Sequence, residues 1–506
     1  MVTTMTALGV TVITLLVFTA LGVWYSRGRV ETIEDFLTAR NTTGSGMTTA
    51  TLIASGMGAW ILFSPAEAGA AFGGLPAVVG YALGSAVPLW LFISVGTRIR
   101  DLIPEGHSLT EYVFARYGPW MYTYVLIITI FYMFIFLSAE MTGIAGALGL
   151  VAGIPNWQTA TLIGLFVLIY TGYGGLVASI FTDTIQTLVI LPLLALGFAG
   201  AILSLGGTGA IYQSVVESQP QLLNPGYVPG VKFGIYVIFA IMGANMFNQG
   251  QWQRVFAAED TDTVRRSFAL AGVTVIPMIF LAGLFGLAAA GMGLTEEGSA
   301  SVAFFLVLNE AFPAWITLVV VILAVLLVMS TADTLFNAIA SIVTADLPRL
   351  LEDPSQNTLS RAARLLTLVV AIAAVFVGTQ GYSVLTLFLL ADLLAAASFI
   401  PFLHGLYSSH ATEWGALVAS LVGLVIGLAY FPTLRNIIAA ISVIGGLLPA
   451  PSFLWSFLGA TVVSGVLTVV FARVTVTQFD LNALDREIRR LDEPATDGGN
   501  SRDQEV

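Results

Sequence analysis

Residues 51–65 read Thr-Leu-Ile-Ala-Ser-Gly-Met-Gly-Ala-Trp-Ile-Leu-Phe-Ser-Pro, an apolar run that glycines and a proline interrupt. It is apolar enough for a membrane helix. However, Gly56 and Gly58 relax a helix, and Pro65 removes one of its hydrogen bonds. A helix that unwinds at membrane depth leaves carbonyl oxygens free, and these are tolerated only where they line a cavity or bind something. The stretch therefore predicts either a broken helix at a binding site or a simple kink.

The composition around this stretch is that of a membrane protein. Of the 506 residues, 57% are hydrophobic and only 10% are charged, whereas soluble domains carry roughly 25% charged residues. A water-soluble globular protein is therefore excluded. The formal charge is −11, without a basic run that could follow a phosphate backbone, so we expect no nucleic-acid partner. Cysteine is absent and the single lysine, Lys232, follows a valine, which excludes disulfides and a P-loop.

Apolar stretches of about 20 residues cross a bilayer as helices, and we identify about thirteen of them. Strands are a poor alternative because the runs are too long and do not alternate. Residues 1–475 are predicted to form one transmembrane domain, and residues 476–506 a polar, largely disordered cytoplasmic tail. The apolar stretch 434–450 is predicted as a re-entrant or surface helix. The predicted spans are 6–25, 47–72, 76–97, 119–149, 157–172, 177–204, 233–250, 266–291, 313–344, 362–379, 383–403, 414–431 and 452–472.

The basic residues predict the orientation of the chain. With an odd number of spans and the N-terminus outside, the inner loops and the tail hold all 19 basic residues except Lys232 and Arg435. This asymmetry is the one that the positive-inside rule requires. We therefore expect a multi-pass protein of the plasma membrane with its N-terminus outside and its C-terminus in the cytoplasm.

Five carboxylates lie inside predicted spans, where each costs roughly 2.5–3.5 kcal/mol on insertion scales. No lysine or arginine lies at similar depth in the predicted topology. Such acids either take up a proton or lie beside a bound cation. Together they favour a cation or proton path, while for each single acid a role in helix packing stays open. The five are Glu67, Glu140, Asp183, Asp333 and Asp392.

The ninth predicted span places two hydroxyls and a carboxylate on one helical face. Ser330, Asp333 and Thr334 share this face by their i, i+3, i+4 spacing. Hydroxyl, carboxylate and carbonyl oxygens suit a hard cation. The alternative is that the hydroxyls bond back to their own helix.

Three motifs resemble the sodium:solute symporter family, which includes proline permeases, sodium–glucose cotransporters and sialic acid transporters. Residues 174–186 are similar to its Gly-Gly…Ala…Thr-Asp-x-x-Gln run. Phe247-Asn248-Gln249 with Gln253-Arg254 is similar to its sixth-core-helix signature. Ser330-Thr331 with Thr344-Ala345-Asp346 is similar to its eighth-core-helix signature.

The resemblance implies an all-α polytopic membrane protein of the LeuT type, with two inverted repeats of five helices and about 13 transmembrane helices. The second and seventh spans would be the broken first and sixth core helices, and substrate would bind near the midplane where they unwind. It also implies a sodium site. Its ligands would be the carbonyls of Ala54, Met57 and Leu327 and the hydroxyls of Ser330 and Thr331.

Some members of the family have a second sodium site. Here it would comprise Asp183, Asp333 and Thr334, with Ser330. Asp333 departs from the hydroxyl residues that the family usually has there, so this second site could hold a cation or a proton. We expect Asp333→Ala to change the ion dependence of transport.

The substrate contacts that the resemblance implies lie at the two helix breaks. Residues 55–60 look like a proline permease, and residues 104–118 look like the corresponding loop of urea symporters. An aspartate of proline permeases is replaced by Gly56, and an aromatic gate of sugar carriers by Ala244. A small uncharged or zwitterionic solute is therefore predicted. The implied contacts are Ser55, Gly56, Trp60, Ile241, Ala244 and Asn245.

The function that the resemblance implies is a sodium-coupled symporter that imports a small polar solute, such as proline or a urea-like compound, by alternating access. The coupling ion would be sodium, with no cofactor and no obligatory protein partner. A proton-coupled symporter, a passive channel and a sensor of the same fold stay open. An enzyme is not expected, because the chain lacks a His-Glu-x-x-His motif, a Gly-x-Ser-x-Gly elbow and any cysteine nucleophile. Arg254 is predicted as an inner-gate charge, and the three histidines as solvated or loop-packing residues.

Overall fold

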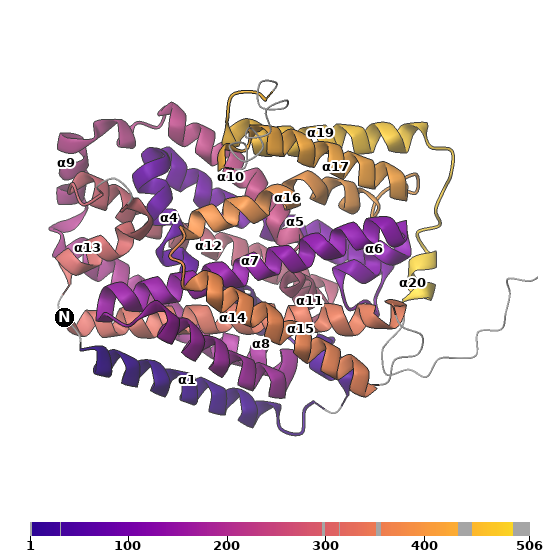
Figure 1. Ribbon diagram of the computed structural model, residues 1–506, viewed down its shortest axis with the longest axis horizontal. Helices are drawn as coiled ribbons and strands as arrows, with labels where there is room; N and C mark the ends of the chain where they lie inside the picture. The colour runs from indigo at the N-terminus through magenta and orange to yellow at the C-terminus, as the bar shows by residue number, and fades with distance from the viewer. Residues whose placement is uncertain are drawn as a thin grey trace, which may run out of the picture.

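The computed structural model describes residues 3–30, 32–295, 299–312, 314–350, 356–433 and 448–488. These residues are almost all helical, and within them the single isolated bridge pairs Thr43 with Ala258. Figure 1 shows the long helices side by side in one bundle, with most of their ends at its left and right. The helix predicted at 434–450 falls largely outside the described residues, as does the tail beyond residue 488.

The helices follow the predicted apolar runs along the chain. The first part of the chain forms α1 (Thr4–Ser26), α2 (Ile33–Thr38), α3 (Ser45–Gly56), η1 (Ala59–Leu62), α4 (Ser64–Glu67), η2 (Ala68–Gly73), α5 (Gly74–Leu102), α6 (Leu109–Tyr117), α7 (Pro119–Ala152) and α8 (Asn156–Ser204). The middle forms α9 (Gly207–Ser218), η3 (Pro220–Leu223), α10 (Val228–Met246), α11 (Gln249–Ala257), α12 (Thr261–Gly291), η4 (Ala300–Val302) and α13 (Ala303–Ala311). The last part forms α14 (Ala314–Leu350), α15 (Gln356–Gly378), α16 (Val384–His404), α17 (Glu413–Tyr430), α19 (Phe453–Val474) and α20 (Ala483–Glu487).

Eleven helices of the described chain are long and apolar enough to cross a membrane. The all-helical prediction is confirmed, but the count of thirteen crossings is not. One difference lies in the second predicted span, because its first part, α3, has only 12 residues and the remainder continues into α5. The other lies in the fifth predicted span, of which residues 156–169 form only a short apolar helix.

Gly175 separates the two spans that were predicted at 157–172 and 177–204. Its φ of 55° and ψ of −150° are non-helical, so α8 is two helical segments joined at this glycine. A Cβ at this position would lie 2.4 Å from the carbonyl oxygen of Phe36, which explains why glycine stands here.

The helices that surround the two broken segments pack at glycines. A Cβ on Gly80 of α5 would lie 2.1 Å from the Cα of Gly234 on α10. A Cβ on Gly286 of α12 would lie 1.9 Å from the carbonyl oxygen of Ala66 on α4. Because backbones approach this closely only at small residues, α5, α10 and α12 form a close scaffold around the break that follows α3.

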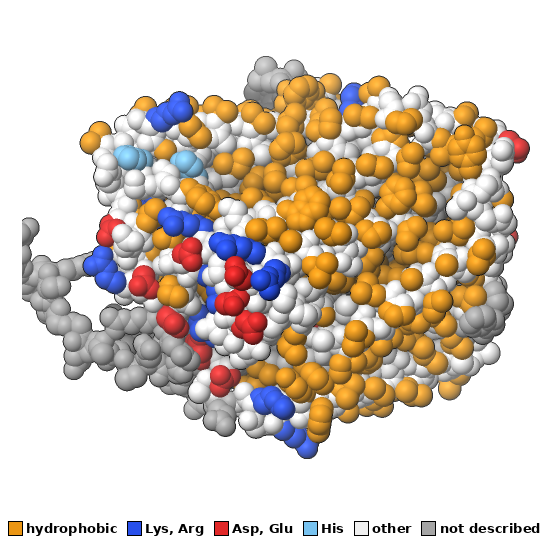
Figure 2. Space-filling view, turned by 180° about the vertical axis from the view of Figure 1, so that it is seen from behind, with side chains coloured by type: hydrophobic (Ala, Val, Ile, Leu, Met, Phe, Trp, Pro, Cys, Tyr) orange, Lys and Arg blue, Asp and Glu red, His pale blue; other side chains and the backbone are white. Residues whose placement is uncertain are grey.

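The outer surface matches the membrane assignment. Large apolar side chains such as Leu188 and Leu203 lie on the outside, and Figure 2 shows apolar side chains over much of the visible face. Most of the charged side chains in this view gather toward one end. There Arg98 and Arg116 donate hydrogen bonds to the loop after α16, and Arg100 to the end of α11.

Candidate functional site

The first predicted helix break lies directly after Gly56. The N–H of Met57 still bonds to the carbonyl of Ile53 at 3.0 Å, but Gly58 is extended, with φ −89° and ψ −170°. A second helical segment, η1, begins at Ala59. The indole N–H of Trp60 donates to the carbonyl of Gly56 at 3.2 Å across this break.

A carboxylate from α7 caps the second segment. Glu140 Oε2 accepts a hydrogen bond from the N–H of Ala59 at 2.6 Å. A Cβ on Gly58 would lie 2.0 Å from Glu140 Oε1, so glycine at 58 makes room for this contact. A negative group at the N-terminus of a helical segment is favourable for the N–H groups there. Glu140 therefore has a structural partner at the break.

The second predicted break lies between α10 and α11. Phe247 and Asn248 are non-helical, and the Asn248 side chain accepts from the N–H of Gly250 at 3.0 Å, so that it caps α11. The carbonyl of Met246 accepts from the indole of Trp252 at 2.9 Å. Side chains thus satisfy backbone groups that the break releases.

A cavity of about 60 Å³ lies between the two breaks. Five of the six predicted substrate contacts line it, and Ser55 does not, because its hydroxyl donates to the Thr51 carbonyl at 2.6 Å. Asp392 was predicted as an intramembrane acid but not as part of this cavity. The full lining is Gly56, Trp60, Tyr81, Tyr132, Phe136, Val237, Ile241, Ala244, Asn245, Asn248, Leu385, Phe388, Leu389 and Asp392.

Sequence reasoning missed the aromatic lining of this cavity. Trp60 was predicted, whereas Tyr81, Tyr132, Phe136 and Phe388 were not. Nothing distinguishes these four from other core aromatics in the sequence. The spacing of Tyr132 and Phe136 was the one available signal, because residues four apart lie on one helical face.

The five predicted sodium ligands are all buried. Ala54, Leu327, Ser330 and Thr331 have no exposed surface, Met57 is almost as buried, and α3 and α14 pack against each other. Thr331 Oγ1 has no hydrogen-bond partner among the described residues. A buried hydroxyl without a partner costs free energy, so an oxygen in this state is suited to a bound ion.

Ser330 also connects this set to Asp183 of α8. Its hydroxyl donates a short hydrogen bond to Asp183 Oδ1. Thr51 of α3 donates to Asp183 Oδ2 at 2.6 Å. One carboxylate therefore links α3, α8 and α14.

Arg254 enters the same cluster, which corrects the expectation that no basic residue lies at the depth of the acids. Its Nη2 is 3.0 Å from Asp183 Oδ2, and both side chains are fully buried. The expectation was wrong because Arg254 was predicted in a loop, whereas the break before α11 carries it against α3 and α14. Desolvating this charge requires a partner, which Asp183 provides.

The same guanidinium reaches the residues predicted for the second site. Arg254 Nη2 donates to Thr334 Oγ1 at 2.7 Å, and Ser179 donates to Asp333 Oδ1 at 2.8 Å. Asp183, Asp333 and Thr334 thus lie in one polar cluster with Arg254. Two carboxylates and one guanidinium give it a formal charge of −1 when both acids are ionised.

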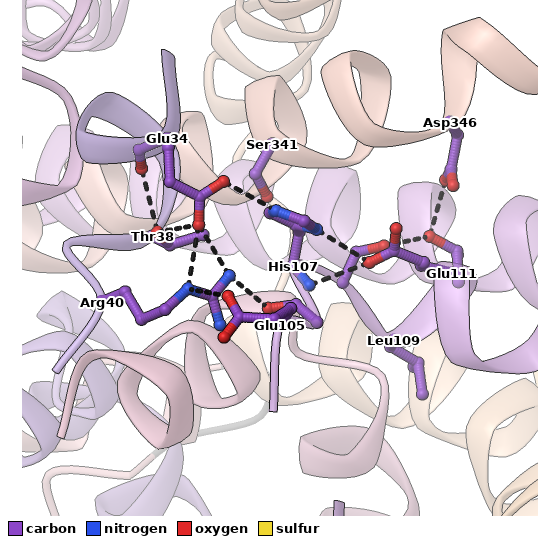
Figure 3. A network of polar contacts seen from close by, with 12 residues as sticks. Glu34, Thr38, Arg40, Glu105, His107, Leu109, Glu111, Ser341 and Asp346 are labelled. Carbon is purple, nitrogen blue, oxygen red and sulfur yellow. Dashed lines mark hydrogen bonds and ion pairs between the residues drawn. The ribbon is translucent and has the colours of Figure 1, made fainter. Parts of the chain in front are cut away.

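A separate network lies near the arginine-rich end of the bundle (Figure 3). His107 Nε2 is 2.8 Å from Glu34 Oε2, and His107 Nδ1 is 3.0 Å from Glu111 Oε2. Arg40 Nη2 is 2.7 Å from Glu34 Oε1. His107 is therefore a packed, ion-paired residue and not a solvated one.

Burial alone would lower the pKa of His107, but the charges and hydrogen bonds of Glu111 and Glu34 outweigh it and raise the pKa to about 9. Burial alone would raise the pKa of Glu34, but His107 and Arg40 lower it to about 2. His107 and Glu34 are thus charged together near neutral pH.

Two motif residues, Gln249 of α11 and Asp346 of α14, bond to this end of the bundle. Gln249 Oε1 accepts from the N–H of Leu109 at 2.9 Å, and its Nε2 donates to the carbonyl of His107 at 2.8 Å. Asp346 Oδ2 accepts from Thr110 at 2.6 Å. α6 and the loop before it are therefore tied to α11 and α14.

Comparisons with known proteins agree with this architecture. The sequence profile of the sodium:solute symporter family matches residues 35–423. The chain is 26% identical to the spermidine transporter DUR31 of Candida albicans, over 92% of this chain and 89% of that protein. It is 26% identical to the sodium/pantothenate symporter of Escherichia coli, over 66% of this chain and 72% of that protein. It is 22% identical to the urea–proton symporter DUR3 of Oryza sativa, over 83% of this chain and 64% of that protein.

Solved structures show the same fold. A Na⁺-coupled sialic acid symporter in a substrate-bound outward-open state matches with a TM-score of 0.75 and 18% identity, over 93% of this chain and 98% of that one. A nucleobase-cation-symport-1 family transporter in a closed conformation matches with a TM-score of 0.59 and 13% identity, over 91% and 100%.

Proposed function

The chain belongs to the sodium:solute symporter family, and on that premise we propose that it is a sodium-coupled symporter that imports a small polar solute by alternating access. Like the relatives described above, it is a membrane transporter and not an enzyme.

The observation that carries the proposal is the hydroxyl of Thr331. It is fully buried on α14 without a hydrogen-bond partner in the described chain, and α14 packs against α3 just before the break. The carbonyls of Ala54, Met57 and Leu327 and the hydroxyls of Ser330 and Thr331 would hold sodium. Such oxygens are the ligands that a hard cation prefers.

Sodium in this position would couple the ion to the solute. It would bridge α3 and α14, while the solute would occupy the cavity that Gly56 and Trp60 line after the same break. Ion and solute would thus stabilise the same arrangement of α3. Each sodium ion that moves down 100 mV supplies ~2.3 kcal/mol, before any concentration gradient is added.

The cluster of Asp183, Asp333 and Thr334 is the proposed second site, for a second sodium ion or a proton. Arg254 already pairs with Asp183, so the acid of Asp333 supplies the additional negative charge. Proton coupling at this cluster is the alternative function, and the observation that favours it is this buried pair of acids with a single guanidinium.

The proposed location is the plasma membrane, with the N-terminus outside and the C-terminus in the cytoplasm. Its support is the gathering of four arginines at one end of the bundle: Arg40 after α2, Arg98 and Arg100 near the end of α5, and Arg116 near the end of α6. The positive-inside rule assigns that end to the cytoplasm.

Thermal unfolding of the purified protein in sodium and in potassium at equal ionic strength tests the sodium site. Sodium should raise the melting temperature by mass action. Thr331→Val should abolish this rise. Thr129→Val is the matched control, because Thr129 is also buried but donates to the Val125 carbonyl of its own helix at 2.7 Å. Equal melting in both salts, or a full sodium response in Thr331→Val, would refute the site.

A further inference from the structure

We propose that the transported solute is an organic cation whose ammonium group lies against Asp392, inside a ring of aromatic side chains in the cavity between the two helix breaks. The inference rests on the proposed function, because it names the class of solute for the same transport cycle. It differs from the uncharged or zwitterionic solute that the sequence predicts.

Asp392 is the charged residue of this cavity. It lies on α16, is 4% exposed, and its Oδ1 has no hydrogen-bond partner in the part of the chain that the structure describes. No described lysine or arginine lines the cavity with it. A buried carboxylate without a partner is costly unless a cation or a proton compensates it. The cavity thus presents an uncompensated negative group to its occupant.

The first break offers no competing site for an anion. Helix N-termini bind carboxylates through free N–H groups. Here the N–H of Ala59 already donates to Glu140 at 2.6 Å, so the protein supplies its own carboxylate at the start of η1. A solute carboxylate would therefore find this N–H already occupied, and in the cavity it would meet Asp392 without a basic side chain among the described lining residues. Anionic solutes are disfavoured for both reasons.

The aromatic walls of the cavity favour an organic cation over a bare metal ion. The rings of Trp60 and Phe388 lie 6.0 Å apart, and those of Phe136 and Phe388 lie 5.1 Å apart. Tyr81 and Tyr132 complete the aromatic lining. Aromatic faces attract ammonium groups by the cation–π interaction. A bare sodium ion would need about six oxygen ligands. Besides Asp392, the lining side chains offer the hydroxyls of Tyr81 and Tyr132 and the amide oxygens of Asn245 and Asn248, of which Asn248 already caps α11.

The size of the cavity limits the solute. One water needs roughly 10–15 Å³ by the same measure, so a cavity of about 60 Å³ holds about four to six non-hydrogen atoms. This volume fits a small amine, or one end of a longer one, and is too small for a sugar ring.

The experiment measures binding of 1,4-diaminobutane, which has six non-hydrogen atoms, to the full-length protein in detergent with sodium. The neutral isostere 1,4-butanediol, the anion succinate and urea are the comparison solutes. Asp392→Asn keeps the shape of the side chain and removes its charge. Glu67→Gln is the control variant, because Glu67 is another buried acid of the spans but bonds to Ser383 and does not line the cavity.

We expect the diamine to bind and to compete with other amines, whereas butanediol, succinate and urea do not bind at the same concentration. Asp392→Asn should weaken diamine binding at least tenfold, and Glu67→Gln should change it less than twofold. Retained sodium-induced stabilisation in Asp392→Asn would show that the variant is folded.

Two results would overturn the inference: no diamine binding to the wild type, or equal binding by Asp392→Asn. Loss of the sodium response with intact, Asp392-dependent diamine binding would instead refute the proposed sodium coupling and leave the assigned solute class standing. Sodium-driven binding of urea or succinate without diamine binding would refute the assigned solute class and leave the proposed sodium coupling standing.

Discussion

Replacing His107 by glutamine should remove the part of the pH dependence of folding stability between pH 6 and pH 9 that comes from the His107 proton. His107 has no exposed surface and lies between two acids. Its Nε2 is 2.8 Å from Glu34 Oε2, and its Nδ1 is 3.0 Å from Glu111 Oε2. These acids raise its pKa from the usual 6.5 to about 9. A pKa that is raised in the folded state stabilises the fold fully below pH 6.5, and this contribution is lost as the pH rises through 9.

The size of the effect follows from the shift in pKa. At about 1.4 kcal/mol per pKa unit, the proton on His107 contributes about 3 kcal/mol at pH 6, about 2 kcal/mol at pH 7.5 and under about 0.5 kcal/mol at pH 9. The pKa of Glu34 is lowered to about 2. Its contribution is present above its usual pKa and is lost only as the pH falls through 2, so it is constant across this window.

The measurement is the free energy of unfolding in mixed micelles at pH 6, 7.5 and 9. Over this range the wild type should lose about 3 kcal/mol more than His107→Gln, so that the two curves converge at high pH. His410→Gln is the control, because His410 lies near Gln478 outside the network. If wild type and His107→Gln lose the same stability between pH 6 and 9, the ion-paired histidine does not exist as described.

Three further predictions concern the buried acids. Asp183→Asn and Arg254→Gln should each destabilise the protein by about 3–5 kcal/mol because each leaves a buried charge unpaired. The double variant should lose clearly less stability than the sum of the two single losses. Additive losses would exclude the ion pair between Asp183 and Arg254. Gly58→Ala should lower the melting temperature, since its Cβ would lie 2.0 Å from Glu140 Oε1, and the further change Glu140→Ala should recover part of that loss. Asp333→Ala should change the sodium or proton dependence of uptake in proteoliposomes, and ion activation equal to wild type would remove Asp333 from the cycle.

The helices and their breaks could be predicted because their causes are local. Twenty apolar residues in sequence require a helix in lipid, and Gly56, Gly58 and Pro65 mark the place where one is interrupted. The same local reading located Ser330, Asp333 and Thr334 on one face of α14. The structure places all three within the buried cluster around Asp183 and Arg254.

The partners of the charged groups could not be predicted in this way. Arg254 follows a break by only a few residues, so a small error in where α10 ends moved it from the bundle to a loop. Glu140 and Ala59 are far apart in the sequence, and their contact depends on how α7 packs against η1. Ser55 and Gly56 are adjacent, and one residue along a helix rotates the side-chain direction by about 100°. The Ser55 side chain therefore points away from the cavity and bonds to its own helix.

The hydroxyl of Ser330 has a single proton, and it donates that proton in a hydrogen bond to Asp183. Its lone pairs are what remains for a metal. A cation that drew on those lone pairs would polarise the O–H bond and strengthen the hydrogen bond to the aspartate, because neighbouring polar contacts reinforce one another. A bound ion would then strengthen the hydrogen bond between α14 and α8 before any helix moves. The charge state of the Asp183 cluster would in turn change the affinity for the ion.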